Sequence, residues 1–145
     1  MDAFIARGGN FTDTANAYTK GHSEKIIGDH LGRHPHKRDR LVIATKFFTN
    51  LYAGDPNGGS ASRKAIVAAC DQSLRRLQTS YIDLYWMHCW EAITPIEETM
   101  RALDDLVDSG SAGGRPWWRC RSSTRCSNAR WRASFCRWRA SWAWG

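Results

Sequence analysis

The first 110 of the 145 residues predict an α/β fold built around a parallel sheet. Two patterns lead to this prediction. Short apolar runs rich in β-forming residues alternate three times with longer segments of helical periodicity, which is typical of βαβ units. In addition, polar, titratable side chains stand at the ends of these runs, as happens when parallel strands deliver catalytic groups to one rim of a barrel. We therefore expect part of a (β/α)8 TIM barrel, comprising about three strand–helix units of its N-terminal half.

The first strand–helix unit follows a short helical segment. Residues 3–7 and the two glycines after them predict the end of a helix, because glycine favours a helix C-terminus. A strand is predicted over residues 10–14. Helical spacing then runs through residues 26–31, with Ser23 as the predicted N-cap and Gly32 as the predicted end.

The second unit begins with a strand predicted over residues 41–46. Its residues 41–44 form a continuous apolar run, as expected of a strand that is covered on both faces. Residues 49–62 are rich in Gly, Asn, Asp and Ser and predict a long loop. A helix follows, and the third strand is predicted over residues 81–88. The apolar stripe of that intervening helix consists of Ile66, Val67, Cys70, Leu74 and Leu77.

The helix of the third unit has the clearest local start signal in the chain. Thr94 is predicted as its N-cap, Pro95 as its first residue and Glu97 as the partner of Thr94 in a capping box. We expect its core face to consist of Ile96, Met100, Leu103, Leu106 and Val107.

Four titratable residues lie in or next to these strands: Asp13, Tyr18, Lys46 and His88. Taken singly, each is most simply a polar residue at a strand end. Taken together, they form a set suited to proton transfer, because an ammonium and an imidazole beside a phenol promote the release of its proton. The four residues therefore predict a catalytic tetrad.

The sequence blocks around the tetrad resemble the aldo-keto reductase family. The resemblance extends over residues 1–110. The blocks are most similar in sequence to the branch that includes aryl-alcohol dehydrogenase-like enzymes and potassium-channel β-subunits. The matching blocks are residues 9–15, 23–28, 42–47, 73–77, 81–85, 87–88 and 94–100.

The resemblance implies a (β/α)8 barrel that reduces aldehydes or ketones to alcohols with NADPH, acting on a small carbonyl substrate. By the same resemblance Tyr18 is the general acid, and Lys46, paired with Asp13, promotes release of its proton. His88 orients the substrate carbonyl, and Asp13 also contacts the cofactor. Trp90, just beyond the third strand, is a further candidate for substrate binding. The sequence does not distinguish among carbonyl substrates or between NADPH and NADH.

The resemblance ends near Gly110, and residues 111–145 form a segment of a different kind. They hold eight arginines and no acidic residue, whereas residues 1–110 hold 13 basic and 14 acidic residues, so the net charge of +7 arises in this tail. The tail also carries six of the eight tryptophans and almost no aliphatic residues. We interpret it as a disordered, out-of-frame product of a GC-rich gene. An Arg/Trp nucleic-acid arm and a cationic membrane-surface segment are the alternatives.

On this interpretation, the chain is a truncated and inactive reductase fragment. The first barrel strand would lie upstream of Met1 and the last four beyond Gly110. A non-catalytic regulatory or scaffold protein of the same fold is the alternative. Neither nucleic acid nor membrane is an expected partner, and the oligomeric state is open.

Cysteine spacing and the absence of a targeting segment limit the other classes. Cys120, Cys126 and Cys136 match no common zinc pattern, and no histidine lies in the tail, so the sequence predicts no metal site. No signal peptide and no apolar run of bilayer length are present, which predicts a cytoplasmic protein with reduced thiols.

Overall fold

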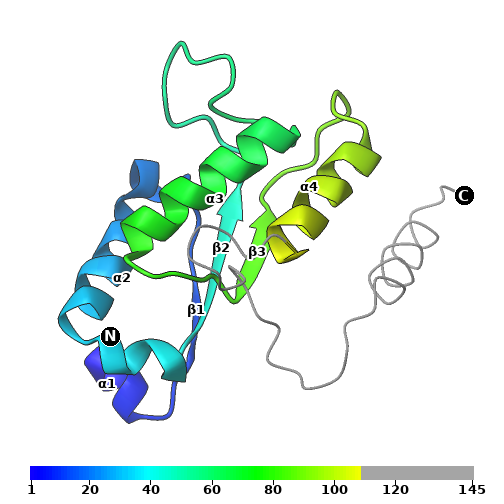
Figure 1. The fold of residues 1–145 in the computed structure, drawn as a ribbon. Helices are drawn as coiled ribbons and strands as arrows, with labels where there is room; N and C mark the ends of the chain where they lie inside the picture. The colour runs from blue at the N-terminus through cyan, green and yellow to red at the C-terminus, as the bar shows by residue number, and fades with distance from the viewer. Residues whose placement is uncertain (109–145) are drawn as a thin grey trace, which may run out of the picture.

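The computed structural model describes residues 1–108 as a small parallel sheet with helices packed against it (Figure 1). Helices and strands alternate along the chain, and two short 3-10 segments interrupt the connections. In chain order the elements are α1 (Asp2–Ala6), β1 (Phe11–Asp13), η1 (Tyr18–Gly21), α2 (His22–Arg33), η2 (Pro35–Arg40), β2 (Val42–Phe47), α3 (Arg63–Leu77), β3 (Leu84–Met87) and α4 (Ile96–Asp108).

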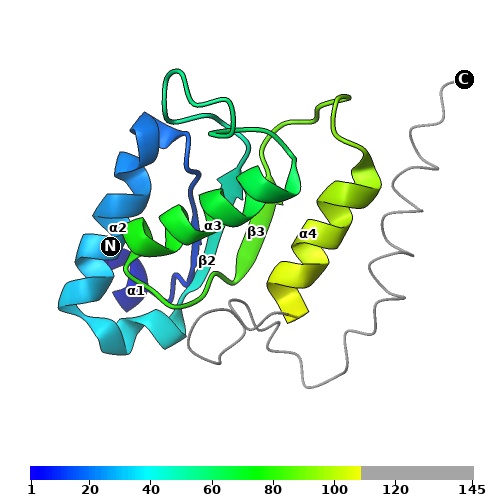
Figure 2. The same cartoon turned by 45° about the horizontal axis from the view of Figure 1, so that its top comes forward.

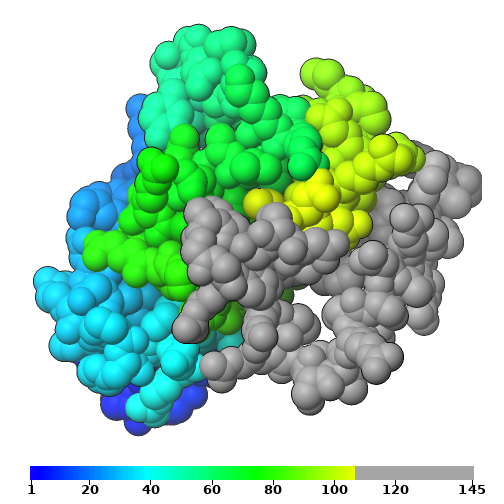
Figure 3. Space-filling model, viewed as in Figure 1, coloured from blue at the N-terminus to red at the C-terminus, as the bar shows by residue number. Residues whose placement is uncertain are grey.

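The three strands are parallel and lie in the order β1-β2-β3. Helices α2, α3 and α4 cover the same face of the sheet, which both ribbon views show (Figures 1 and 2). The predicted α/β fold with about three βα units of a barrel is thereby confirmed. The long loop between β2 and α3 projects beyond the carboxyl end of the sheet (Figure 3).

The core lies between the sheet and this helix layer. Alternation along β2 places Ile43 and Phe47 toward the helices, where both are fully buried. They pack in one cluster with Ile66 and Leu77 of α3. The predicted stripe of α3 is confirmed except at Val67, which is 41% exposed because it lies one residue, or about 100°, around the helix from Ile66.

The predicted start of α2 was wrong by two residues. Gly21 precedes the helix with a φ of +87°, a left-handed conformation that glycine adopts without strain. Ser23 lies inside the first turn, where its Oγ accepts a hydrogen bond from Thr14 instead of capping the helix. The helix continues through Gly32 to Arg33, so Gly32 does not end it.

The predicted capping box of α4 was also wrong. The helix begins at Ile96, and the Pro95 carbonyl already accepts a helical hydrogen bond from the Thr99 amide. Thr94 donates its hydroxyl proton to Glu91 instead of capping the helix. Glu91 lies only three residues before Thr94, and its carboxylate also accepts a hydrogen bond from the distant Ala61 amide at 2.7 Å, a contact that the local sequence pattern does not reveal.

The core face of α4 is rotated relative to the predicted one. Thr99, Ala102 and Leu106 are buried, whereas Ile96, Met100 and Leu103 are only half-buried. The side chain of Val107 and the whole tail of residues 111–145 lie outside the described residues, so the predictions made for them remain predictions. None of the helices among residues 1–108 combines the length and apolar character needed to cross a membrane.

Candidate active site

The four predicted tetrad residues converge at the carboxyl edge of the sheet. The Nζ atom of Lys46 donates hydrogen bonds to Asp13 Oδ2 at 2.6 Å and to the hydroxyl of Tyr18 at 3.4 Å. The rings of Tyr18 and His88 lie edge to face, with 5.8 Å between their centroids and an interplanar angle of 85°. One ammonium thus connects a carboxylate and a phenol, and the imidazole lies against the phenol ring.

Strand register explains the meeting of Asp13 and Lys46. Asp13 pairs with Ala44 in the ladder, and Lys46 is two residues further along β2, so both side chains point to the same face of the sheet. That face is opposite the helices. Lys46 also donates to the Thr14 carbonyl at 2.9 Å, which fixes its ammonium at the end of β1.

The environment of Lys46 keeps its side chain charged. Partial burial lowers the pKa of the ammonium, but the hydrogen bonds to Asp13 and Tyr18 outweigh this effect and leave the pKa above its ordinary value. The ammonium also lies 5.1 Å from the centroid of the Tyr18 ring. A charged ammonium therefore lies within hydrogen-bonding distance of the Tyr18 hydroxyl.

Tyr18 is held by a strained turn, not by a strand. It opens η1, and the next two residues have left-handed backbones: Thr19 with a φ of 48° and Lys20 with a φ of 54°. Such a conformation is unusual for a β-branched residue such as Thr19 and costs on the order of 1–3 kcal/mol. The turn leaves Tyr18 41% exposed, so its hydroxyl group can meet a small molecule.

Two buried polar atoms near the tetrad lack hydrogen-bond partners among the described residues: Nδ1 of His88 and Oδ1 of Asn16. Asn16 is 2% exposed, its amide donates to the Lys46 carbonyl at 3.0 Å, and its side-chain nitrogen donates to the Thr49 carbonyl at 3.3 Å. Sequence reasoning missed Asn16, although it lies between Asp13 and Tyr18 in the block that drew attention to both. Unpaired buried polar atoms are costly, so these two atoms are candidates to bond to a polar group of a ligand.

Two tryptophans lie in or just after β3, the strand that leads to His88. Trp86 pairs with Lys46 in the ladder, lies on the same face and is 51% exposed. Trp90 is 59% exposed and makes no aromatic contact with Tyr18 or His88 among the described residues. Its predicted role in substrate binding therefore remains a prediction.

A buried ionic network supports the site from the helix side of the sheet. Glu24 of α2 is fully buried, and its carboxylate accepts hydrogen bonds from Thr45 at 2.5 Å and from the Nε of Arg76 at 2.7 Å. Thr45 directly precedes Lys46 in β2. The network joins α2, α3 and β2, and no spacing rule in the sequence indicates it.

Titratable side chains gathered at the carboxyl edge of a parallel sheet are typical of barrel folds. The profile of the aldo/keto reductase family matches residues 1–114, and the chain belongs to that family.

Individual relatives agree with this membership. Norsolorinic acid reductase B of Dothistroma septosporum is 41% identical over 115 residues, which are 76% of this chain and 29% of the relative. Aryl-alcohol dehydrogenase GME11368 of Pestalotiopsis microspora is 37% identical over 114 residues, with the same coverage of each chain. Norsolorinic acid reductase stcV of Emericella nidulans is 32% identical in an alignment that covers 99% of this chain and 39% of the relative.

The segment that this chain shares with the first two of these relatives spans only about 29% of their length. Their names include an aryl-alcohol dehydrogenase, in agreement with one half of the predicted branch. The other half, the potassium-channel β-subunits, remains a prediction.

Proposed function

We propose that Asp13, Tyr18, Lys46 and His88 form the proton-donating part of a carbonyl reductase site that uses NADPH and acts on aldehydes or ketones. One observation supports this proposal above all: the Lys46 ammonium contacts both the Asp13 carboxylate and the Tyr18 hydroxyl. Membership of the aldo/keto reductase family and the reductases among the relatives support the same chemistry.

In this proposal the Tyr18 hydroxyl donates its proton to the carbonyl oxygen of the substrate. The phenolate left behind is stabilised by the adjacent Lys46 ammonium, and Asp13 holds that ammonium in place. His88, beside the Tyr18 ring, orients the carbonyl by a hydrogen bond. A positioned general acid contributes about 10²–10⁴-fold to a rate, so most of the effect of Tyr18 should appear in kcat.

The residues at the site are compatible with a nicotinamide cofactor. The unpartnered Oδ1 of Asn16 is a hydrogen-bond acceptor, and the unpartnered Nδ1 of His88 is a donor or an acceptor according to the tautomer of the ring, so both suit a carboxamide or carbonyl group. Together with Asp13, they are the described residues that would hold the reactive end of the cofactor. NADPH, when bound, supplies the hydride; the protein supplies position and electrostatic field.

A chimera tests the proposal. Residues 1–110 of this chain would replace the matching segment of norsolorinic acid reductase B, which supplies the rest of a full-length relative. We expect the chimera to oxidise NADPH in the presence of an aldehyde, and we expect Tyr18→Phe to lower its kcat by on the order of a hundredfold or more. Phe11→Tyr places a phenol on the same face of the sheet and is the matched control. Added to the Tyr18→Phe chimera, it should not restore the lost kcat. An active chimera whose rate is unchanged by Tyr18→Phe would refute the role of Tyr18.

The 145-residue chain by itself is expected to show no such activity above background. Its described residues supply three strands, whose outer edges remain without a neighbouring strand among residues 1–108. A misplacement of ~1 Å between hydride donor and carbonyl can cost on the order of a hundredfold in rate. Turnover by the chain alone, abolished by Tyr18→Phe, would contradict this expectation. The described residues and the comparisons give no support to the regulatory or tail-binding alternatives.

A further inference from the structure

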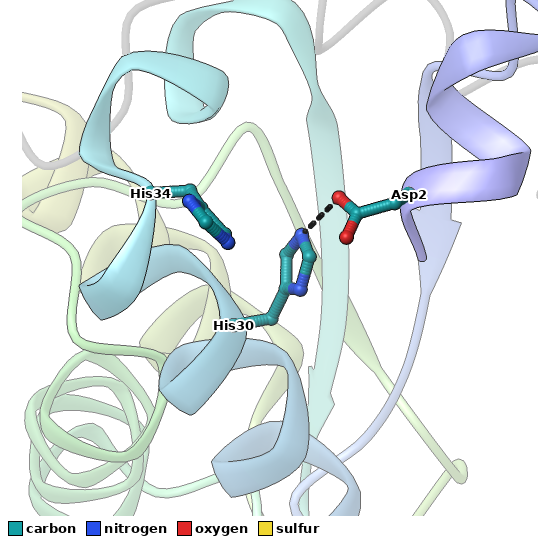
Figure 4. A group of neighbouring side chains, drawn as sticks. All are labelled: Asp2, His30 and His34. Atoms are coloured by element: carbon teal, nitrogen blue, oxygen red, sulfur yellow. Dashed lines mark ion pairs between the residues drawn. The ribbon is translucent and has the colours of Figure 1, made fainter.

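Three side chains from separate segments meet at the end of the fold away from the tetrad (Figure 4). Asp2 belongs to α1, His30 lies in the last turns of α2, and His34 directly follows that helix. One donor atom from each, a carboxylate oxygen and two imidazole nitrogens, lies within 4.8 Å of the other two. The two imidazole rings are 5.2 Å apart between centroids.

The local backbone places the two imidazoles on one side of α2. Their i, i+4 spacing corresponds to about one helical turn. The His34 amide still donates to the Leu31 carbonyl at 2.9 Å, so the turn continues past the last helical residue. The same i, i+4 pairing of histidines on a helix is a known way to present two nitrogen ligands to a metal ion.

His30 is the most enclosed member of the cluster, with a side chain only 14% exposed. Its Nε2 lies 3.3 Å from Asp2 Oδ1, yet the two groups are not oriented as a hydrogen bond, and this buried nitrogen has no hydrogen-bond partner among the described residues. A buried imidazole nitrogen without a partner is suited to donate its lone pair to a cation.

We propose that Asp2, His30 and His34 form a binding site for a divalent transition-metal cation such as Zn²⁺. Two imidazoles and a carboxylate are a common ligand set for this ion. Ligands at about 2.0–2.2 Å in a tetrahedron are separated by roughly 3.3 Å from one another. The observed spread of up to 4.8 Å can close by side-chain rotation, because Asp2 is exposed and His34 is half-buried.

Lys37 competes with the metal for Asp2. Its ammonium forms an ion pair with Asp2 Oδ1, the same oxygen that faces His30. A bound cation would displace this ammonium, so Lys37 weakens the site that we propose. Removal of the Lys37 charge should therefore tighten metal binding, an effect opposite to that of ligand removal.

A metal at this position would connect α1 to the end of α2. Three protein ligands leave a fourth coordination position for water or another small ligand. The site lies at the amino ends of the strands, next to α1 and the end of α2 (Figure 1), whereas the tetrad lies at the carboxyl edge of the sheet. Its occupation is thus independent of the reductase proposal, and neither proposal depends on the other.

The test uses the full 145-residue chain and Zn²⁺ itself, in competition with a chromophoric zinc chelator. Because cysteine thiols in general are also zinc ligands, the decisive readout reports on individual histidines. Histidines are modified with diethylpyrocarbonate with and without one equivalent of Zn²⁺, and modified peptides are quantified by mass spectrometry. We expect Zn²⁺ to protect His34 by at least fivefold and to leave His22, an exposed histidine at the other end of α2, unchanged.

Three variants complete the experiment. The affinity for Zn²⁺, measured by competition with the chelator, should fall at least tenfold in His34→Ala and stay at the wild-type value in His22→Ala. Lys37→Met should bind Zn²⁺ several-fold more tightly. His34 is only half-buried, so its loss leaves the core intact, and a circular dichroism spectrum checks the fold. No protection of His34, equal protection of His22, or an affinity unchanged in either His34→Ala or Lys37→Met would overturn the proposal.

Discussion

Replacement of Arg76 by Met is expected to be the most damaging single change among the charged residues of α3. Arg76 donates from Nε to the fully buried Glu24 carboxylate at 2.7 Å, and its own side chain is 19% exposed. Methionine keeps much of the aliphatic length but removes the charge. Glu24 is then left as a buried carboxylate whose remaining hydrogen bond comes from Thr45.

The expected cost follows from the burial of the pair. Loss of one partner of a buried ion pair destabilises a protein by about 3–5 kcal/mol, because the other charge remains desolvated and uncompensated. The partial exposure of Arg76 lets some water reach the site, so we expect a value near 3 kcal/mol. Urea m-values of about 1–3 kcal/mol/M translate this into a midpoint lower by roughly 1–3 M.

Arg75→Met is the matched control. Arg75 is the neighbouring residue in α3, but its ion pair with Asp71 is a surface pair whose side chains are 77% and 45% exposed. Such pairs contribute about 0.3–0.5 kcal/mol, so its midpoint should barely move. Urea unfolding of the full chain, followed by circular dichroism, measures both variants.

A double substitution separates the buried charge from simple loss of packing. Glu24→Gln removes the charge and keeps an oxygen that can accept from Thr45, so Glu24→Gln combined with Arg76→Met should be more stable than Arg76→Met alone. If Arg76→Met unfolds at the same urea concentration as Arg75→Met, the buried network does not carry the stability that we assign to it.

Two further predictions concern close packing and a buried thiol. Gly28→Ala should destabilise the protein by about 1–3 kcal/mol in the urea assay, because its new Cβ would lie 2.0 Å from a backbone oxygen of α3. Gly32→Ala is the control: its Cβ would meet only the movable side chain of Gln78, so it should be neutral or stabilising. Equal effects of the two would contradict the close approach of α2 and α3. Burial raises the pKa of the Cys70 thiol to about 12. Iodoacetamide at pH 8 should therefore label the exposed Cys89 and spare Cys70, as measured by mass spectrometry. The contribution of the buried Cys70 thiol to stability should be complete below pH 9 and lost as the pH rises toward 12. Rapid labelling of Cys70 in the native protein would refute its placement.

Local patterns in the sequence were sufficient for the architecture and for the position of the candidate site. Strand–helix alternation predicted a parallel sheet, and the carboxyl ends of parallel strands must meet at one edge. Asp13 and Lys46 could therefore be expected to come together before any coordinates were known, and the structure places them 2.6 Å apart. His88, which directly follows β3, joins them for the same topological reason, whereas Tyr18 is placed by the turn that follows β1.

Element ends were less predictable, because they depend on partners outside the local segment. Ser23 is of a residue type that caps helices, but its hydroxyl group accepts a hydrogen bond from Thr14 of another segment. Thr94 bonds to the nearby Glu91, whose carboxylate also accepts from the distant Ala61 amide. A hydroxyl group is satisfied equally well by capping a helix or by bonding to another side chain, so only the tertiary arrangement decides between the two.

The sequence by itself thus determined the order of the elements, the parallel sheet and the edge at which the tetrad gathers. Only the tertiary structure decided that Glu24 is buried against Arg76, that Asn16 lies beside Lys46 with an unpartnered oxygen, and that Asp2 reaches His30. The reason is physical: periodicity reports which face of an element is apolar, whereas the partner of a polar side chain depends on which distant segments the packed core brings within hydrogen-bonding distance.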